Sequence, residues 1–282
     1  MKKLTALLFI ISTLFGCSGE PQSVEQLVNA GEKAIVDGDF ARARDYLSKA
    51  IARQPSDQHI LYLLGTSYRR DFLYDSAYYY LKRADLLHPG DREVNLELHR
   101  VAAVLQEWKS AVRAIHVLIE TGDSKEMYIA DLADYNLRMD NFSVAYHYYR
   151  RLSQIQPDNI EIWRHLVNLA AQLDSLEVAL RVVDSALERF GRQDGLLISK
   201  GLCLAATGDY DQSESIFRSL VAKDTASVAA RINLAHTLSS QNSPAKKREA
   251  LQLYLQVQPR ADKFLKVDSL IEALTEELDG KK

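Results

Sequence analysis

Three consecutive tyrosines, Tyr78, Tyr79 and Tyr80, are the side chains of this sequence that most suggest a chemical site. Adjacent phenols occur in stacking platforms, in radical relays and in the aromatic belts at membrane interfaces. Each of these functions requires the three rings to share one surface. The element that carries the tyrosines therefore decides whether they form a site.

The other reactive side chains do not match a known catalytic or metal-binding pattern. The chain holds no HExxH, GxSxG or CxxC motif and no glycine-rich phosphate loop. The histidines are scattered, and His99, His116 and His165 lie at helical positions that favour packing over metal binding. Cys203 lies among apolar residues, where a reduced cysteine acts as a small hydrophobe. We therefore expect no enzyme activity, no cofactor, no metal and no small-molecule substrate.

Composition favours a folded, helical protein that does not bind nucleic acid. Of 282 residues 47% are hydrophobic, and six prolines with twelve glycines are few for an all-β chain. The net charge of -3 becomes -5 if a leader carrying Lys2 and Lys3 is lost, which argues against a nucleic-acid partner. The short basic run KKRE at 246–249 is interpreted as a solvated loop.

The first residues have the form of an export signal. Lys2 and Lys3 precede an uncharged apolar stretch from Leu4 to Phe15, which is too short to span a bilayer as a helix. The following sequence Leu-Phe-Gly-Cys, ending at Cys17, resembles the lipobox of bacterial lipoproteins. The alternative is an ordinary secretory signal that happens to contain a cysteine.

The lipobox resemblance implies a lipid anchor. It predicts a signal peptide over 1–16, a lipidated Cys17 carrying diacylglycerol and an amide-linked acyl chain such as palmitate, and a tether over 17–22. Several acyl chains give stable anchoring, since each buried CH₂ contributes roughly 0.8 kcal/mol. Ser18 is not the aspartate that marks inner-membrane retention in enteric bacteria, which favours the outer membrane.

A 34-residue period runs through the rest of the chain. Small residues recur at Ala43, Ala77, Ala111, Ala145, Ala179 and Ser213, and bulky residues recur three positions earlier, at Phe40, Tyr74, Trp108, Phe142, Leu176 and Tyr210. Helix-stopping prolines follow at Pro55, Pro89 and Pro157. Such a period indicates a stacked array of identical supersecondary units.

These slots resemble the tetratricopeptide repeat family, whose repeat is an antiparallel pair of helices, A and B. The resemblance implies an all-α, right-handed α-solenoid of about seven helix pairs over 23–262, with a capping helix and tail over 263–282. The expected repeats lie near 24–57, 58–91, 92–125, 126–159, 160–193, 194–227 and 228–262. Asn95 and His99 depart from the family pattern, which leaves the helix pairing of the third repeat open.

The period places the three tyrosines on the B helix of the second repeat. Consecutive helical positions point about 100° apart, so their rings cover different faces. Tyr78 and Tyr80 recur as Tyr146 and Tyr148 two repeats later. We expect these rings to pack between repeats; a partner surface is the alternative interpretation.

The period shifts near the end. From Ser213 the next small residue is Ala250 instead of Lys247, so three extra residues are expected in a flexible loop over 239–248. After Pro259 an amphipathic pattern that includes Phe264, Leu265 and Leu274 predicts the capping helix.

Binding is expected along the face of the A helices, the surface that the family resemblance implies. Arg164 and Asn168 match part of the carboxylate clamp of that family, but Ser199, Ala229 and Asn233 do not continue it. The predicted partner-binding residues are Tyr62, Arg69, Arg70, Arg138, Arg164, Asn168, Ile198 and Leu202. The alternative is an ordinary solvated surface.

The sequence thus predicts a membrane-anchored adaptor or scaffold of the bacterial cell envelope that is attached to the outer membrane and binds protein or peptide partners. The alternative is a permanent structural subunit of an envelope secretion, motility or uptake machine.

Overall fold

The structure is a computed structural model that describes residues 23–258 and 266–280. The predicted signal peptide, Cys17 and its tether lie outside the described residues, as do Phe264 and Leu265 of the predicted cap. The chain divides into two compact units, one ending at Asp123 and the other beginning at Ser124. Each unit is described by itself.

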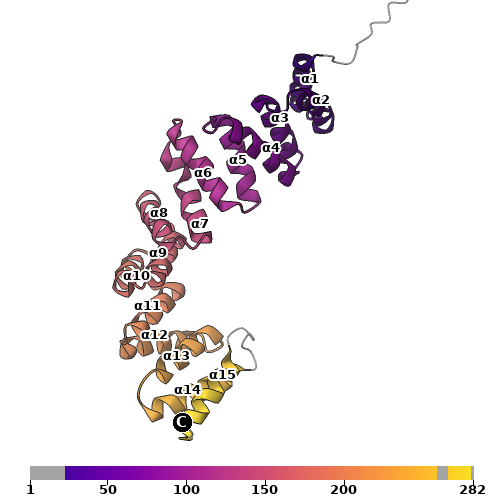
Figure 1. Cartoon of the computed structure of the whole chain (residues 1–282). Helices are drawn as coiled ribbons and strands as arrows, with labels where there is room; N and C mark the ends of the chain where they lie inside the picture. Colours follow the sequence, from indigo (N-terminus) through magenta and orange to yellow (C-terminus); the bar gives the residue numbers. More distant parts are fainter. Residues whose placement is uncertain (1–22, 259–265, 281–282) are drawn as a thin grey trace, which may run out of the picture. The chain divides into compact units, whose positions relative to one another are not determined.

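The described residues form helices and no strands (Figure 1), which confirms the all-α fold. The N-terminal unit contains α1 (Val24–Val36), α2 (Phe40–Arg53), α3 (Gln58–Arg70), α4 (Tyr74–Leu87), α5 (Arg92–Val104) and α6 (Trp108–Glu120). The C-terminal unit contains the 3-10 helix η1 (Lys125–Tyr128), then α7 (Ile129–Arg138), α8 (Phe142–Ile155), α9 (Ile160–Gln172), α10 (Leu176–Phe190), α11 (Asp194–Ala206), α12 (Tyr210–Lys223), α13 (Val228–Ser239), α14 (Pro244–Val257) and α15 (Val267–Leu278).

Each odd-numbered helix from α1 to α13 packs on the even-numbered helix that follows it, as an A helix on its B helix. The contact depends on small residues: Ala43, Ala77, Ala111, Ala145, Ala179 and Ser213 are all fully buried. A β-carbon added to Gly65 would lie 2.5 Å from Cγ of Leu81, so the two helices of that pair approach too closely for a larger residue. The small slots of the sequence are therefore the contact points of the helix pairs.

The turns between A and B helices share one backbone conformation. A residue with positive φ recurs at the same place in six repeats, at Gly38, Phe72, Gln106, Asp140, Asp174 and Gly208. This left-handed residue follows the end of the A helix and lets the chain reverse within three residues. Glycine and aspartate tolerate the conformation, as the turn sequences predict.

The third repeat forms a helix pair like the others. Asn95 on α5 is fully buried, and its amide donates to the carbonyl of Asp91 at 2.8 Å and to the carboxylate of Asp85 at 3.3 Å. Asp85 is itself paired with Arg113 of α6. Polar partners supplied by neighbouring helices thus satisfy the amide nitrogen of the unusual residue.

The prediction of a flexible loop over 239–248, with KKRE in it, is wrong. Ser243 caps α14, whose first residue is Pro244, and the basic run lies in the first turns of that helix. The buried residues Ala250, Tyr254 and Val257 follow their counterparts in α12 by 37 positions, whereas those of α13 follow α11 by 34. The extra residues therefore lengthen the start of a helix, because Ser243 and Pro244 are strong helix-start residues.

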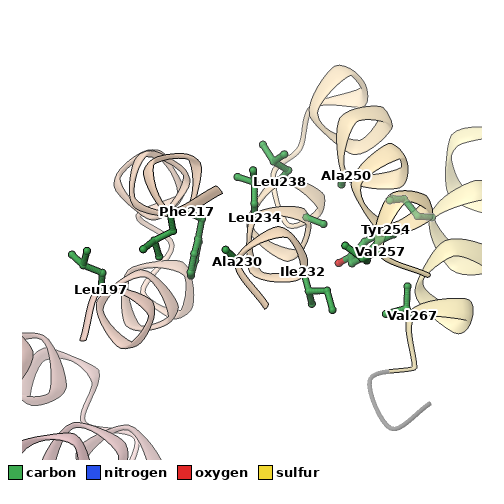
Figure 2. Close-up of a cluster of buried hydrophobic side chains, with 13 residues drawn as sticks. Leu197, Phe217, Ala230, Ile232, Leu234, Leu238, Ala250, Tyr254, Val257 and Val267 are labelled. Atoms are coloured by element: carbon green, nitrogen blue, oxygen red, sulfur yellow. The ribbon is translucent and has the colours of Figure 1, made fainter. Parts of the chain in front are cut away.

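The last helices of the C-terminal unit share one core cluster (Figure 2). It runs from Leu197 and Phe217 through Tyr254 to Val267 and Leu274 of α15. The acidic residues Asp268, Glu272 and Glu276 of α15 are exposed. Helix α15 therefore buries one face on α14 and presents a charged face to solvent, which ends the stack of repeats.

Candidate protein-interaction surface

The three predicted binding residues of the N-terminal unit have different environments. Tyr62 is half-buried and packs against three apolar clusters of the unit. Burial and, second, the nearby Glu97 carboxylate raise the pKa of Tyr62. Tyr62 is therefore mainly a packing residue that stays partly exposed.

Arg69 is already paired inside the unit. Its guanidinium donates to Glu97, whose side chain is 8% exposed, and Arg100 donates to the same carboxylate at 2.8 Å. A partner carboxylate would have to compete with a buried internal one, so Arg69 is a poor anion site. Arg70 is exposed and makes no ion pair among the described residues. The sequence did not reveal the pairing, because Glu97 lies 28 positions away on the next A helix.

In the C-terminal unit, the predicted arginines are exposed and pair with carboxylates of their own helices. Arg138 pairs with Asp134 at 2.7 Å and Arg164 with Glu161 at 3.0 Å, each within its own helix. Exposed pairs of this kind stabilise by roughly 0–1 kcal/mol, so an incoming carboxylate can displace them at little cost. Asn168 is also exposed, one turn after Arg164.

The structure brings Arg164 against α11, where the predicted apolar residues lie. The guanidinium of Arg164 lies 3.5–3.7 Å from the position that a β-carbon of Gly195 would occupy. On the same helix Leu202 is 48% exposed, whereas Ile198 is half-buried and packs against the core cluster of Figure 2. A cation and amide on α9 are thus followed by an exposed apolar side chain on α11.

Sequence reasoning missed an aromatic cluster beside Arg138. The rings of Tyr149 and His165 stack with centroids 4.6 Å apart, and Tyr135 is buried on α7. Burial, followed by the charge of Asp134, raises the pKa of Tyr149 to about 12. Burial, followed by Asp131 and Asp134, raises the pKa of Tyr135 to about 12. The YHYY run at 146–149 was the available signal. These phenols stay neutral at physiological pH.

The three tyrosines of the second repeat do not form one site. Tyr78 shares a 2.7 Å hydrogen bond with Ser110 of α6, and Tyr80 stacks on Tyr68 of α3 with centroids 5.4 Å apart. Tyr79 is 56% exposed and has Arg83 over its ring. Two of the rings therefore pack between helices and the middle one faces solvent.

The described residues contain no obvious reactive centre. No three histidine, cysteine or acidic side chains come together as metal ligands within 23–258 and 266–280. Cys203 is buried with a free thiol, and burial raises its pKa. None of the helices that the structure describes is long and apolar enough to cross a membrane.

Comparisons with known proteins point to one family. A tetratricopeptide repeat family model matches residues 29–92 and 166–228. A search of curated protein sequences finds no match.

Solved structures of similar fold share little sequence with the chain. A chain of the Naa15/Naa10 complex bound to HypK-THB is 13% identical with a TM-score of 0.57; the match covers 90% of this chain and 39% of that one. A tetratricopeptide repeat protein from Parabacteroides merdae is 12% identical with a TM-score of 0.45, over 89% of this chain and 98% of that one. The repeat protein YrrB, titled as having an unusual peptide-binding site, is 17% identical with a TM-score of 0.33, over 76% and 93%. This chain spans about two fifths of the length of the first of these.

Proposed function

Because this chain is a tetratricopeptide repeat protein, we propose that it is a non-enzymatic adaptor that holds protein or peptide partners. The observation that carries the proposal is the sequence of side chains on α9 and α11. The exposed Arg164 and Asn168 offer hydrogen-bond donors, and the exposed Leu202 offers an apolar contact. Such a surface suits a segment that carries an acidic or polar residue beside an apolar one.

Within this proposal Arg138 and Arg164 matter more than Arg69. Arg138 and Arg164 each pair with an exposed carboxylate on their own helix, whereas Arg69 shares the nearly buried Glu97 with Arg100. Arg70 remains a candidate contact of the N-terminal unit, since its side chain is exposed. The surface of the N-terminal unit and the surface of the C-terminal unit are therefore tested with separate variants.

The test is crosslinking of the tagged protein in cells, with captured partners identified and quantified by mass spectrometry. Arg164→Glu combined with Leu202→Asp should reduce the yield of the main partners by at least fivefold, because both charge and apolar contact are lost. Arg70→Glu tests the N-terminal unit in the same way. Arg150→Glu, on the exposed side of α8, is the matched control and should leave the yields unchanged. Unchanged capture by the folded double variant would rule the surface out.

We further propose that the adaptor is anchored to the cell envelope through lipid on Cys17, facing partners of that compartment. The leader pattern supports this location. Metabolic labelling with a clickable fatty acid should mark the wild type and not Cys17→Ser, and the variant should leave the membrane fraction. Equal labelling of both proteins would exclude Cys17 as the lipid site.

A permanent subunit of an envelope machine is the second candidate. It is supported by large apolar side chains on the surface of the N-terminal unit, with Val36 82%, Phe72 75% and Leu86 73% exposed. A permanent subunit is expected to aggregate when purified without its neighbours, whereas an adaptor is expected to be monomeric in solution. Light scattering of the purified protein distinguishes the two.

A further inference from the structure

One leucine position of the repeat is occupied by a lysine in a single copy. Five A helices carry a leucine at one position of the 34-residue period, at Leu64, Leu98, Leu132, Leu166 and Leu234, and each is at most 3% exposed; α1 carries the small apolar Ala30 there. The same position on α11 is Lys200. Comparison of the repeats with one another therefore shows that leucine fits at this position of an A helix.

The partner of Lys200 is also exceptional. Its ammonium lies 2.6 Å from Oδ1 of Asp184 on α10, and the lysine side chain is 27% exposed. The position of Asp184 carries basic residues in four other B helices, at Lys82, His116, Arg150 and Arg218. Replacing a partly buried ion pair by apolar residues is often neutral or stabilising, so stability of the stack does not account for this pair.

Lys200 lines a cavity that opens between α10, α11 and α12. The cavity has a volume of about 280 Å³, with apolar walls from Leu187, Leu197 and Ile216. Leu197 is at one end of the core cluster in Figure 2. Arg192 also lines the cavity; it is exposed and makes no ion pair among the described residues. The cavity therefore combines two cations with an apolar wall.

This cavity is separate from the A-helix surface proposed above. Lys200 lies two positions after Ile198 and two before Leu202, so its side chain points about 200° away from theirs around α11. The two surfaces are on opposite sides of one helix, and a variant of one leaves the other in place.

We propose that this cavity is a second binding site, which takes a carboxylate of a partner protein together with the apolar side chain next to it. The carboxylate lies between Arg192 and Lys200, which both line the cavity, and it competes with the half-exposed Asp184 for the ammonium of Lys200. The apolar side chain lies against Leu187 and Ile216. Charge complementarity selects an acidic segment over a basic or neutral one.

The first experiment titrates the full-length protein with a blocked dipeptide, N-acetyl-leucyl-aspartate methylamide, and follows methyl resonances by NMR. The methyl groups of Ile216 and Leu187 should shift in a saturable way. The matched probe, with asparagine in place of aspartate, should bind at least fivefold more weakly. Equal binding of both probes, or shifts confined to Ile198 and Leu202, would overturn the proposal.

The second experiment uses Lys200→Leu, which introduces the residue that five other repeats carry. This variant should melt at a higher temperature than the wild type and bind the acidic probe at least tenfold more weakly. If it binds the acidic probe as tightly as the wild type, the assignment of the site is wrong.

Arg192→Gln provides an independent variant at the exposed rim of the cavity, where a substitution is not expected to affect folding. It should weaken binding of the acidic probe several-fold and leave the melting temperature unchanged. Arg150→Gln on α8 should leave binding unchanged. Leu202→Asp separates the two surfaces, since it should reduce partner capture at the A-helix face and leave the shifts at Ile216 intact. Unchanged affinity in Arg192→Gln would count against the proposed carboxylate position.

Discussion

Phe72 occupies a backbone position that aromatic residues avoid. Its φ is 60°, and glycine holds the equivalent place at Gly38 and Gly208. The ring is 75% exposed and meets the edge of Tyr74 with centroids 6.3 Å apart. The left-handed conformation destabilises a residue with a β-carbon by roughly 1–2 kcal/mol. Because the phenyl ring is mostly exposed, its packing offsets little of this cost.

Phe72→Gly is therefore expected to stabilise the N-terminal unit by roughly 0.5–1 kcal/mol, after the entropy loss of glycine is subtracted. Chemical denaturation measures the gain. The matched reverse change, Gly208→Phe, should destabilise the C-terminal unit, because it imposes the same strain at φ 84°. A less stable Phe72→Gly protein would show that the phenyl ring contributes more packing than its exposure indicates.

Glu214 links α12 to the start of α14 and should make stability depend on acid pH. Burial alone would raise its pKa, but hydrogen bonds from Lys246, Gln241 and Arg218 outweigh burial and lower the pKa to about 2. In the unfolded chain the pKa of a glutamate carboxyl is about 4.3, so the unfolded state binds the proton first as pH falls. The stabilisation is present above about pH 4.3 and is lost between there and about pH 2.

Glu214→Gln should consequently be less stable than the wild type at pH 6, and the difference should shrink as pH approaches 2. Urea unfolding at several pH values measures both curves. Asp45→Asn, which removes an exposed pair with Lys49 on one helix, is the control and should change the pH dependence little. Parallel curves for Glu214→Gln and the wild type would show that Glu214 keeps an ordinary pKa.

At the scale of the elements, the helices of a pair fit through residues of complementary size. Gly201 faces Phe217, and an added β-carbon would lie 2.6 Å from the ring atom Cζ. The same two positions, 34 residues earlier, are Val167 and Val183, both buried. A small residue on the A helix thus accompanies a large one on the B helix, and two medium residues fill the same space.

This rule predicts the result of transplanting one pair into the next repeat. Gly201→Val should destabilise the protein by about 1–3 kcal/mol through overpacking against the ring. Adding Phe217→Val should recover part of that loss, so that the double variant is more stable than the two single effects predict by about 0.5–3 kcal/mol. Thermal and denaturant unfolding of the four proteins gives the coupling. Additive effects would show that the valines do not share the space.

At the scale of the whole molecule, consecutive repeats within each unit are joined by ion pairs between residues 27–31 positions apart. In the N-terminal unit these pairs include Arg44–Asp71, Arg69–Glu97 and Arg113–Asp85. In the C-terminal unit they include Arg189–Asp158 and Arg218–Glu249, and Lys247–Glu277 joins the last repeat to α15 in the same way. Each repeat therefore interacts mainly with its neighbours, as in other solenoids.

Nearest-neighbour coupling predicts local effects of damage. Gly65→Val, which forces a side chain against Leu81, should raise amide hydrogen exchange in α3 and α4 first and leave α11 to α14 close to wild type. Gly201→Val should produce the converse pattern. Hydrogen exchange followed by mass spectrometry measures both. Uniform acceleration over the described helices would indicate one cooperative unit.

The sequence by itself determined the helix pairs, because their contact requires a small residue at a fixed interval and a left-handed turn residue between helices. Ala77 and Gly65 are examples of the small contact residues, and Asp140 is an example of the turn residue. It could not place the start of α14, because three added residues are compatible with either a longer loop or a longer helix. The choice followed from the cap at Ser243 and from ion pairs of Lys246 and Lys247 with distant helices.

The tertiary structure alone decided which charged residues remain available for partners. Arg69 and Arg164 look equivalent in the sequence, yet one shares the buried Glu97 of the next A helix and the other has an exposed partner on its own helix. It also showed that Lys200 pairs with Asp184 and lines a cavity. These pairings depend on the separation of side chains from different repeats, and a sequence period gives positions along the chain but no distances between helices.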